Sequence, residues 1–255
     1  MPRTRKRVVR CAALFLCLAC FATTGAAACP PIDGPAFRVR QAFDGDTLRL
    51  ADGRKVRLAG VDTPELGHDG APDEPYAQAA HRFMQELLEK NHWRVRLTAA
   101  RERKDRYGRT LGYVAGTDGT DLQTALLERG LALTTLLPPN LSRLDCLKAA
   151  ESRARRARRG LWRLLPKDPH HLKGAPRHLF VRGRVRRVGR SRKSLWIDLD
   201  GPLSLRIARS DLRRFSDIHF DRLPGREIEA QGWLHKRRRG WMMRLRHPAA
   251  LKVVH

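Results

Sequence analysis

The segment from Thr47 to Val61 carries the pattern that most restricts the fold. Polar and apolar residues alternate on both sides of the turn sequence Ala51-Asp52-Gly53-Arg54. Alternation with a period of two is typical of a strand with one buried face, and an Asp-Gly pair between two such stretches favours a hairpin. Pro64 has no amide proton for a strand ladder, so pairing should stop just before it. The sequence therefore predicts a β-hairpin whose return strand delivers Asp62.

Four short segments bring acids and arginines to the ends of such elements: Phe43–Thr47, Val56–Leu58, Val61–Glu65 and Asp105–Arg109. Asp46 and Asp62 leave neighbouring strands near the same end, and two close carboxylates repel one another unless a cation or proton intervenes. A lone Asp-Gly-Asp usually only marks a turn. Its spacing to the other segments instead favours a divalent cation, and Ca²⁺ suits an oxygen shell completed by waters and a substrate phosphate.

Three further side chains fit the hydrolysis of a phosphodiester. Glu65 lies three residues beyond Asp62, in a place suited to holding a water beside the ion as a general base. Arg57 and Arg109 would neutralise the charge that grows on the non-bridging oxygens, because guanidinium forks bind such oxygens bidentately. The segments together predict a metal-dependent nuclease.

From about Arg38 to Trp162 the chain resembles the thermonuclease family, the staphylococcal-nuclease-like domain. The matching stretches are FDGDT, VRLAGVDTPE, DRYGR, LQTALLERGLA and ARRARRGLW. The resemblance implies Asp46, Asp62 and the carbonyl of Thr63 as Ca²⁺ ligands, Glu65 as the base, and Arg57 and Arg109 as phosphate clamps. It also implies a mainly β fold with helices, a five-stranded OB-type barrel packed with helices over Tyr76–Asn91 and Asp121–Arg129.

The chain departs from the family pattern in two loops. Residues 133–140 contain no aromatic residue where the best-known member has two tyrosines that flank the nucleotide, and residues 67–74 are acidic where a lysine-bearing loop is expected. Tyr107 remains beside Arg109, so it is the aromatic residue expected to touch substrate.

The N-terminus predicts a secretory signal peptide over residues 1–28, with basic residues, an apolar run and a small-residue stretch in that order. An uncleaved membrane anchor is the alternative, and acylation of Cys29 is a weaker one. The protein is expected to be periplasmic or secreted, without a transmembrane segment once the signal is removed. Only Cys29 and Cys146 then remain, which favours one disulfide in an oxidising compartment, although Cys146 could simply be buried on a helix.

The nuclease region, residues 29–163, is expected to end in a helix over 149–161 that is capped by Gly160. A proline-containing linker, residues 164–176, would follow. Residues 177–255 alternate in five short strands, with a helical or looped stretch over 210–223, and predict a second small OB-like β-barrel.

The formal charge of +26 predicts a polyanionic partner, and the basic surplus is concentrated in residues 175–255. We expect the tail barrel to hold DNA or RNA without sequence preference through the basic turn Lys236, Arg237, Arg238 and Arg239. Trp196, Trp233 and Trp241 are more often core than stacking residues in such a barrel. No stable protein partner is expected, and the protein should be a monomer. The alternatives are an inactive nuclease-like binding module and an envelope or polyanion binder that is indifferent to Ca²⁺.

Overall fold

The computed structural model describes residues 29–254, and its first half is built around a closed barrel of β1 (Ala36–Ala42), β2 (Thr47–Leu50), β3 (Lys55–Leu58), β5 (Arg94–Lys104) and β6 (Thr110–Gly116). The strands are ordered β1-β2-β3-β6-β5, and β3 and β6 run parallel. The predicted hairpin is confirmed, since Thr47 pairs with Arg57 and Leu48 with Val56. The expectation that its return strand delivers Asp62 was wrong, because β3 ends at Leu58 and the chain turns at Ala59 and Gly60 before Asp62. A separate two-stranded sheet joins β4 (Val61–Asp62) to β7 (Leu133–Thr134).

Three helices pack on this barrel: α1 (Ala77–Lys90), α2 (Leu122–Glu128) and α3 (Leu144–Arg156). Asp121 caps α2, because its side chain accepts a hydrogen bond from the backbone N–H of Thr124. The first two helices fall within the ranges that the family resemblance implied. For the third, the expected range 149–161 was wrong at both ends, since α3 begins at Leu144 and stops at Arg156, but the expectation that Cys146 lies on a helix is confirmed. Arg158 has a φ of 51° just beyond it, and Gly160 instead begins the 3-10 helix η1 (Gly160–Arg163).

The second half forms another barrel with the same strand arrangement. Its strands are β8 (His178–Arg190), β9 (Ser194–Leu199), β10 (Leu203–Ala208), β11 (Glu227–Arg237) and β12 (Gly240–Leu245). The order β12-β10-β9-β8-β11 is closed by β11 against β12, and β10 and β12 run parallel, as β3 and β6 do in the first barrel. Two 3-10 helices, η2 (Leu212–Phe215) and η3 (Phe220–Arg222), occupy the predicted break. The fold class expected from the sequence is confirmed.

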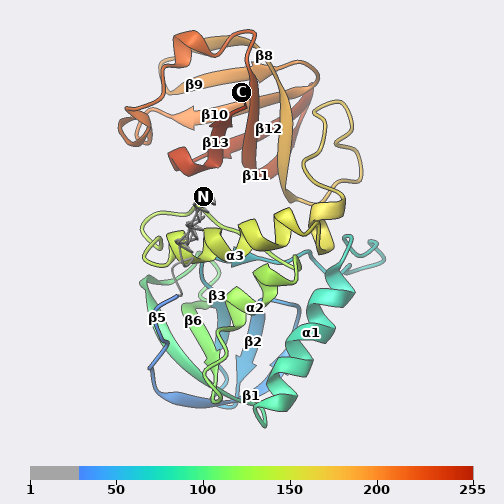
Figure 1. The fold of residues 1–255 in the computed structure, drawn as a ribbon, viewed down its shortest axis with the longest axis vertical. Helices are drawn as coiled ribbons and strands as arrows, with labels where there is room; N and C mark the ends of the chain where they lie inside the picture. Colours follow the sequence, from blue (N-terminus) through green and yellow to red (C-terminus); the bar gives the residue numbers. More distant parts are fainter. Residues whose placement is uncertain (1–28, 255) are drawn as a thin grey trace, which may run out of the picture.

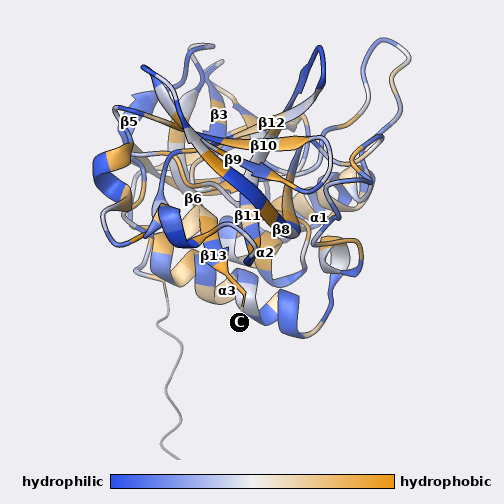
Figure 2. Ribbon diagram, turned by 90° about the horizontal axis from the view of Figure 1, so that it is seen from above, coloured by the Kyte–Doolittle hydropathy of each residue, from blue (hydrophilic) through white to orange (hydrophobic). Residues whose placement is uncertain are grey.

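Two features of the second barrel lie outside the predicted pattern. The 3-10 helix η4 (Pro248–Ala250) leads into β13 (Leu251–Val253), which adds to the edge of β11. The segment 164–176 is packed on the barrel, because Leu172 is buried and the N–H of Lys167 donates to the carbonyl of Phe180 at 2.8 Å. In Figure 2 hydrophobic and hydrophilic residues both occur along the strands, as expected for barrels with one buried face.

Helix α3 lies between the two barrels (Figure 1). From it Arg155 pairs with Glu229 on β11, and Lys148 donates to Gln231 on the same strand at 3.2 Å. Gln231 also donates to the carbonyl of Thr134 on β7 at 2.5 Å. These contacts fix the second barrel on α3 and the β4–β7 sheet. No helix within residues 29–254 is long and apolar enough to cross a membrane, and the predicted signal peptide lies outside the described residues.

Candidate active site

The predicted site residues lie around β3 of the first barrel, on that strand, beside it on neighbouring elements, or just beyond its end. Asp46 comes directly before β2, whose first residue pairs with Arg57 on β3. Strand β6 runs beside β3, with Thr110 opposite Val56, so Arg109 enters on the neighbouring strand. Strand β4 then carries Asp62.

Arg57 joins the two predicted metal ligands. Its Nη1 contacts Asp46 Oδ2 and its Nη2 contacts Asp62 Oδ1, so the two carboxylates converge on one guanidinium. The three side chains are 13 %, 4 % and 12 % exposed, which makes the group largely desolvated. The N–H of Thr63 donates to Asp46 Oδ2 at 2.7 Å and fixes that carboxylate further. The structure therefore brings together Asp46, Asp62, Thr63 and Arg57.

Gly45 permits this close approach. A Cβ at this position would lie 2.7 Å from Thr63 Cγ2 and 2.8 Å from Ala80 Cβ, both too short for real contacts. The turn is held from within by Asp44, whose Oδ1 accepts from the N–H groups of Asp46 and Thr47 at 2.8 and 2.6 Å. The small residue and its acidic neighbour thus set where Asp46 sits.

Glu65 is exposed, yet its carboxyl responds to the acids of the site. Its pKa is raised, first because the surrounding protein removes part of its water and then because Asp44 and Asp62 place negative charge nearby. Burial raises the pKa of Asp44 as well, against the opposing charge of Arg57. A raised pKa suits a general base, since base strength increases with pKa while the group stays ionised near neutral pH.

Arg109 is oriented by its own loop. Its Nε donates to Asp105 Oδ2 at 2.6 Å, and the carboxylate of Asp105 also accepts from two backbone N–H groups of the loop. Burial alone would raise the pKa of Asp105, but these hydrogen bonds outweigh it and the pKa is lowered. Tyr107 is 68 % exposed and lies under the guanidinium groups of Arg106 and Arg109, 4.7 and 5.5 Å from its ring centre. The ring is thus presented to solvent beside the predicted clamp.

The second barrel reaches Asp62, which the sequence did not predict. His178 Nδ1 lies 3.2 Å from Asp62 Oδ2, and Trp233 Nε1 donates to the same oxygen at 3.2 Å. Burial would raise the pKa of Asp62, but the contact with His178 and the charge of Arg57 outweigh it, so the pKa is lowered. More than a hundred residues separate these side chains from Asp62, and no local motif marks their meeting.

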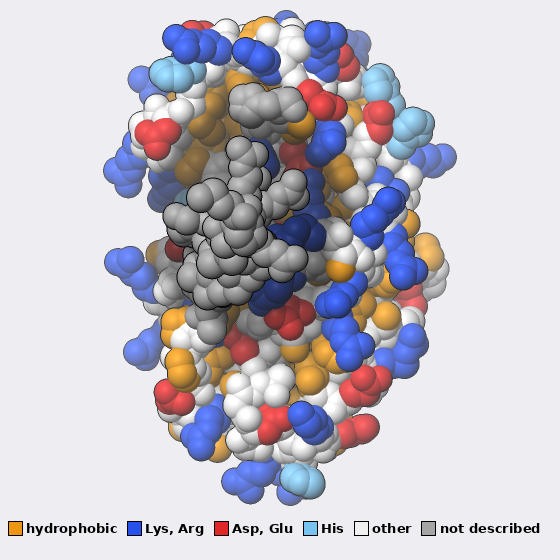
Figure 3. Space-filling model, in the orientation of Figure 1, with side chains coloured by type: hydrophobic (Ala, Val, Ile, Leu, Met, Phe, Trp, Pro, Cys, Tyr) orange, Lys and Arg blue, Asp and Glu red, His pale blue; other side chains and the backbone are white. Residues whose placement is uncertain are grey.

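The remaining predicted residues lie away from this cluster. Cys29 and Cys146 form a disulfide with a Cα–Cα distance of 5.1 Å, which joins the start of the described chain to α3. Residues Lys236–Arg239 are exposed at the tip of the β11–β12 hairpin. Figure 3 shows Lys and Arg side chains on both halves of one face of the molecule.

The three tryptophans of the second barrel differ in their surroundings. Trp241 packs against the barrel core, as expected. Trp233 does not, because it turns outward to Asp62. Trp196 is half-buried on β9 and lies beneath Arg206 and Arg237, at 5.8 and 5.1 Å from its ring centre. The expectation of a core role was therefore wrong for Trp233 and for Trp196, neither of which packs against the barrel core.

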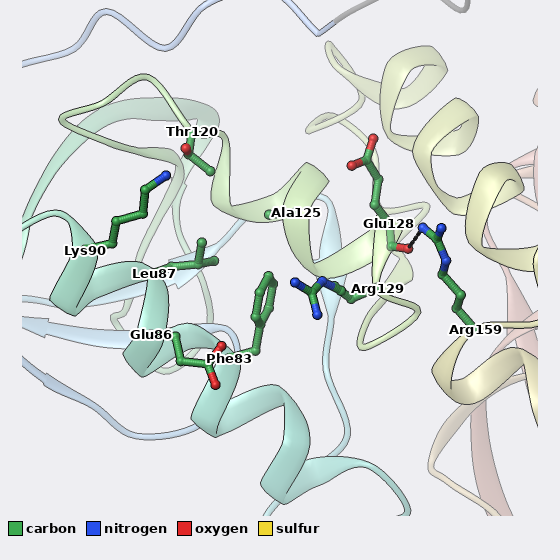
Figure 4. A pocket seen from close by; sticks show the side chains of 9 residues that line it. All are labelled: Phe83, Glu86, Leu87, Lys90, Thr120, Ala125, Glu128, Arg129 and Arg159. Atoms are coloured by element: carbon green, nitrogen blue, oxygen red, sulfur yellow. Dashed lines mark hydrogen bonds between the residues drawn. The ribbon is translucent and has the colours of Figure 1, made fainter.

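A separate hollow of about 400 Å³ lies between α1 and α2 (Figure 4). Its lining includes Phe83, Arg129 and Arg159, and Arg159 donates to the carbonyl of Glu128 at 3.2 Å. None of the predicted site residues lines it. The candidate chemistry is thus confined to the barrel end around Asp46 and Asp62.

The donor set around Arg57 fits a hard divalent cation. Asp46 and Asp62 each place one carboxylate oxygen against the Arg57 guanidinium, so the two oxygens are close enough together to bind one metal ion. Carboxylate oxygens are the ligands that Ca²⁺ prefers. Within residues 29–254 no group of three or more His, Cys, Asp or Glu side chains has the arrangement of a metal site. A cation here would therefore need ligands beyond acidic side chains, such as the carbonyl of Thr63, waters and substrate.

Comparisons with known proteins match the first barrel. The family described as staphylococcal nuclease homologue matches residues 55–164. A thermonuclease of Staphylococcus intermedius is 37 % identical over 134 residues, which cover 51 % of this chain and 78 % of that protein. A thermonuclease of Staphylococcus hyicus is 33 % identical over 130 residues, or 49 % of this chain and 75 % of that protein. The endonuclease YncB of Bacillus subtilis is 32 % identical over 126 residues, or 48 % of this chain and 59 % of that protein. The chain belongs to the thermonuclease family.

Proposed function

We propose that this protein is a Ca²⁺-dependent nuclease that hydrolyses the phosphodiester bonds of DNA, RNA or both with little sequence preference. The observation that carries the proposal is the convergence of Asp46 and Asp62 on Arg57 in a largely desolvated group. This arrangement puts two acids that can hold a metal ion and a guanidinium that can bind a phosphate oxygen in one place, as metal-assisted hydrolysis of a phosphodiester requires. Membership of the thermonuclease family supports the same function.

Each residue has a distinct proposed role. Asp46, Asp62 and the carbonyl of Thr63 would hold Ca²⁺, which when bound supplies a Lewis acid for the scissile phosphate. Glu65 would accept a proton from the attacking water, and its raised pKa makes it a stronger base than an ordinary glutamate. Arg57 and Arg109 would stabilise the charge on the non-bridging oxygens, and the exposed ring of Tyr107 would contact the substrate beside Arg109.

We further propose that residues 29–163 form the nuclease domain, 164–176 a connecting segment and 177–255 a nucleic-acid-binding domain. The exposed turn Lys236–Arg239 would contact phosphates without reading bases. Basic residues of the second barrel also lie close to the first. Burial, the charge of Arg244 and the charge of Arg106 from the first barrel all lower the pKa of Arg246. Basic groups of both barrels thus meet near Tyr107.

The disulfide between Cys29 and Cys146 fits a protein that acts in the periplasm or outside the cell as a monomer. A signal peptide over residues 1–28 would take it there. The lowered pKa of Asp62 keeps its carboxylate ionised at neutral pH, as a cation ligand must be.

The test is cleavage of single-stranded DNA, double-stranded DNA and RNA by the purified full chain, with Ca²⁺ and with a chelator. Cleavage should require Ca²⁺, and Asp46→Asn and Asp62→Asn should each abolish both cleavage and calorimetric Ca²⁺ binding. Asp52→Asn, in the exposed turn of the same hairpin, is the matched control and should cleave normally. Full activity in the chelator would refute the proposed function.

A further inference from the structure

The contact between the second barrel and Asp62 is built from two adjacent strands. His178 is the first residue of β8 and is paired in register with Trp233 on β11. Their rings stack with centres 4.3 Å apart and planes inclined by 14°, and His178 Nδ1 and Trp233 Nε1 both lie 3.2 Å from Asp62 Oδ2. His178 is 6 % exposed and Trp233 is half-buried, so the imidazole is the enclosed member of the pair. The stack presents two nitrogen atoms to one carboxylate oxygen.

The surrounding contacts fix the stack relative to the first barrel. Gln231, two residues before Trp233 on the same face of β11, donates to the carbonyl of Thr134. Thr134 lies on β7, which pairs with β4, the strand that ends in Asp62. On the other flank Glu74 accepts from the backbone N–H of Arg177 at 2.8 Å and from that of Glu65 at 3.0 Å. The second barrel is thus anchored to residues on both sides of Asp62.

The two oxygens of Asp62 have different partners. Oδ2 is within 3.2 Å of His178 and Trp233, whereas Oδ1 contacts Arg57, which also holds Asp46. Trp233 Nε1 donates a hydrogen bond to Oδ2, and the His178 imidazole is in close contact with the same oxygen. A carboxylate held in this way through one oxygen presents the other in a fixed direction, and such outer partners commonly change metal affinity 10- to 100-fold. The orientation of Asp62 therefore depends on residues that the family match does not cover.

We infer that His178 and Trp233 are positioning residues of the nuclease site, which hold Asp62 by Oδ2 so that Oδ1 faces Asp46 and Arg57. The inference rests on the function proposed above. It makes the second barrel a part of the active site as well as a holder of substrate. Neither residue touches the reacting atoms, because both act through Asp62.

The experiment measures Ca²⁺ affinity by calorimetry on the full chain, without substrate. Trp233→Phe and His178→Phe each keep a stacked ring but remove the nitrogen that faces Asp62. Each should weaken Ca²⁺ binding by roughly 10- to 100-fold. His178→Asn places an amide donor near the position of Nδ1 and should restore most of the affinity. Trp241→Phe, which makes the same change in the barrel core, should bind Ca²⁺ as the original protein does.

The outcomes separate this inference from the proposed function. If Asp62→Asn abolishes Ca²⁺ binding while Trp233→Phe and His178→Phe bind normally, the inference is wrong and the proposed function stands. An equal loss in Trp241→Phe would also overturn it, since the effect would then be general loosening of the barrel. If Asp62→Asn binds Ca²⁺ normally, the metal assignment itself fails and the positioning role fails with it.

Discussion

Arg57→Gln should change stability and Ca²⁺ affinity in opposite directions. Arg57 contacts Asp46 and Asp62 through separate nitrogens. Its side chain is 13 % exposed, and those of Asp46 and Asp62 are 4 % and 12 % exposed. Loss of one partner from such a buried charge group leaves an uncompensated charge and typically costs about 3–5 kcal/mol. Without Ca²⁺ the variant should lose about that much free energy of unfolding.

Ca²⁺ should reverse part of this loss, because it would compete with the guanidinium for the same two carboxylates. We expect Arg57→Gln to bind Ca²⁺ more tightly than the original protein, to regain most of its stability when saturated, and still to cleave slowly, because the phosphate clamp is gone.

The assay is urea unfolding with and without Ca²⁺, combined with calorimetric Ca²⁺ titration and cleavage rates. Arg54→Gln is the matched control, since Arg54 pairs with Asp52 in the same hairpin at about 40 % exposure, and such surface pairs contribute at most about 1 kcal/mol. Equal stability losses in the two variants, or weaker Ca²⁺ binding by Arg57→Gln, would refute the reasoning.

Three other predictions follow from the described contacts. The Cys29→Ser/Cys146→Ser protein should lose about 5 kcal/mol of unfolding free energy in the chain-entropy model, because the bond closes a separation of 117 residues, and denaturant unfolding would measure the loss. Arg109→Lys loses the guanidinium fork held by Asp105, so it should cost about 2–4 kcal/mol of transition-state stabilisation, measured as a lower kcat/KM. Arg103→Lys, on the exposed end of β5, should leave kcat/KM unchanged. Burial would raise the pKa of Glu229, but its pairing with Arg155 outweighs burial and the pKa is lowered. The ion pair should therefore stabilise the protein fully above the ordinary pKa of 4.5, and this stabilisation should be lost as the pH falls through the lowered pKa. As the pH falls below about 4.5, the melting temperature of Glu229→Gln should therefore drop less than that of the original protein, and equal drops would contradict this assignment.

The first hairpin and the strands of the second barrel could be predicted because their signals are local. Alternation around Ala51–Arg54 fixes which residues face the core, and the apolar residues of β9 and β10 repeat every second position. The short β13 lacks such a pattern, since it has only three residues. The C-terminal end of α3 depends on Arg158 and Gly160, whose positive φ angles the sequence does not reveal.

The candidate site could be predicted as far as its residues belong to short motifs. Asp46 directly precedes β2, which pairs with β3, the strand of Arg57, and Thr63, next to Asp62, lies 17 positions after Asp46, so spacing and strand direction bring these residues together. The contact of Trp233 with Asp62 spans 171 positions and depends on how one barrel docks on the other. Docking of this kind is set by scattered surface contacts such as Arg155 with Glu229, which carry no sequence pattern.

Glu65→Gln tests the central claim most directly, because it separates catalysis from metal binding and folding. The side chain keeps its size and loses only its basicity. We expect unchanged calorimetric Ca²⁺ affinity and unchanged thermal stability, with turnover on single-stranded DNA lowered by a factor of about 10² to 10⁴. Turnover equal to that of the original protein at saturating Ca²⁺ would contradict Glu65 as the general base of a Ca²⁺-dependent nuclease.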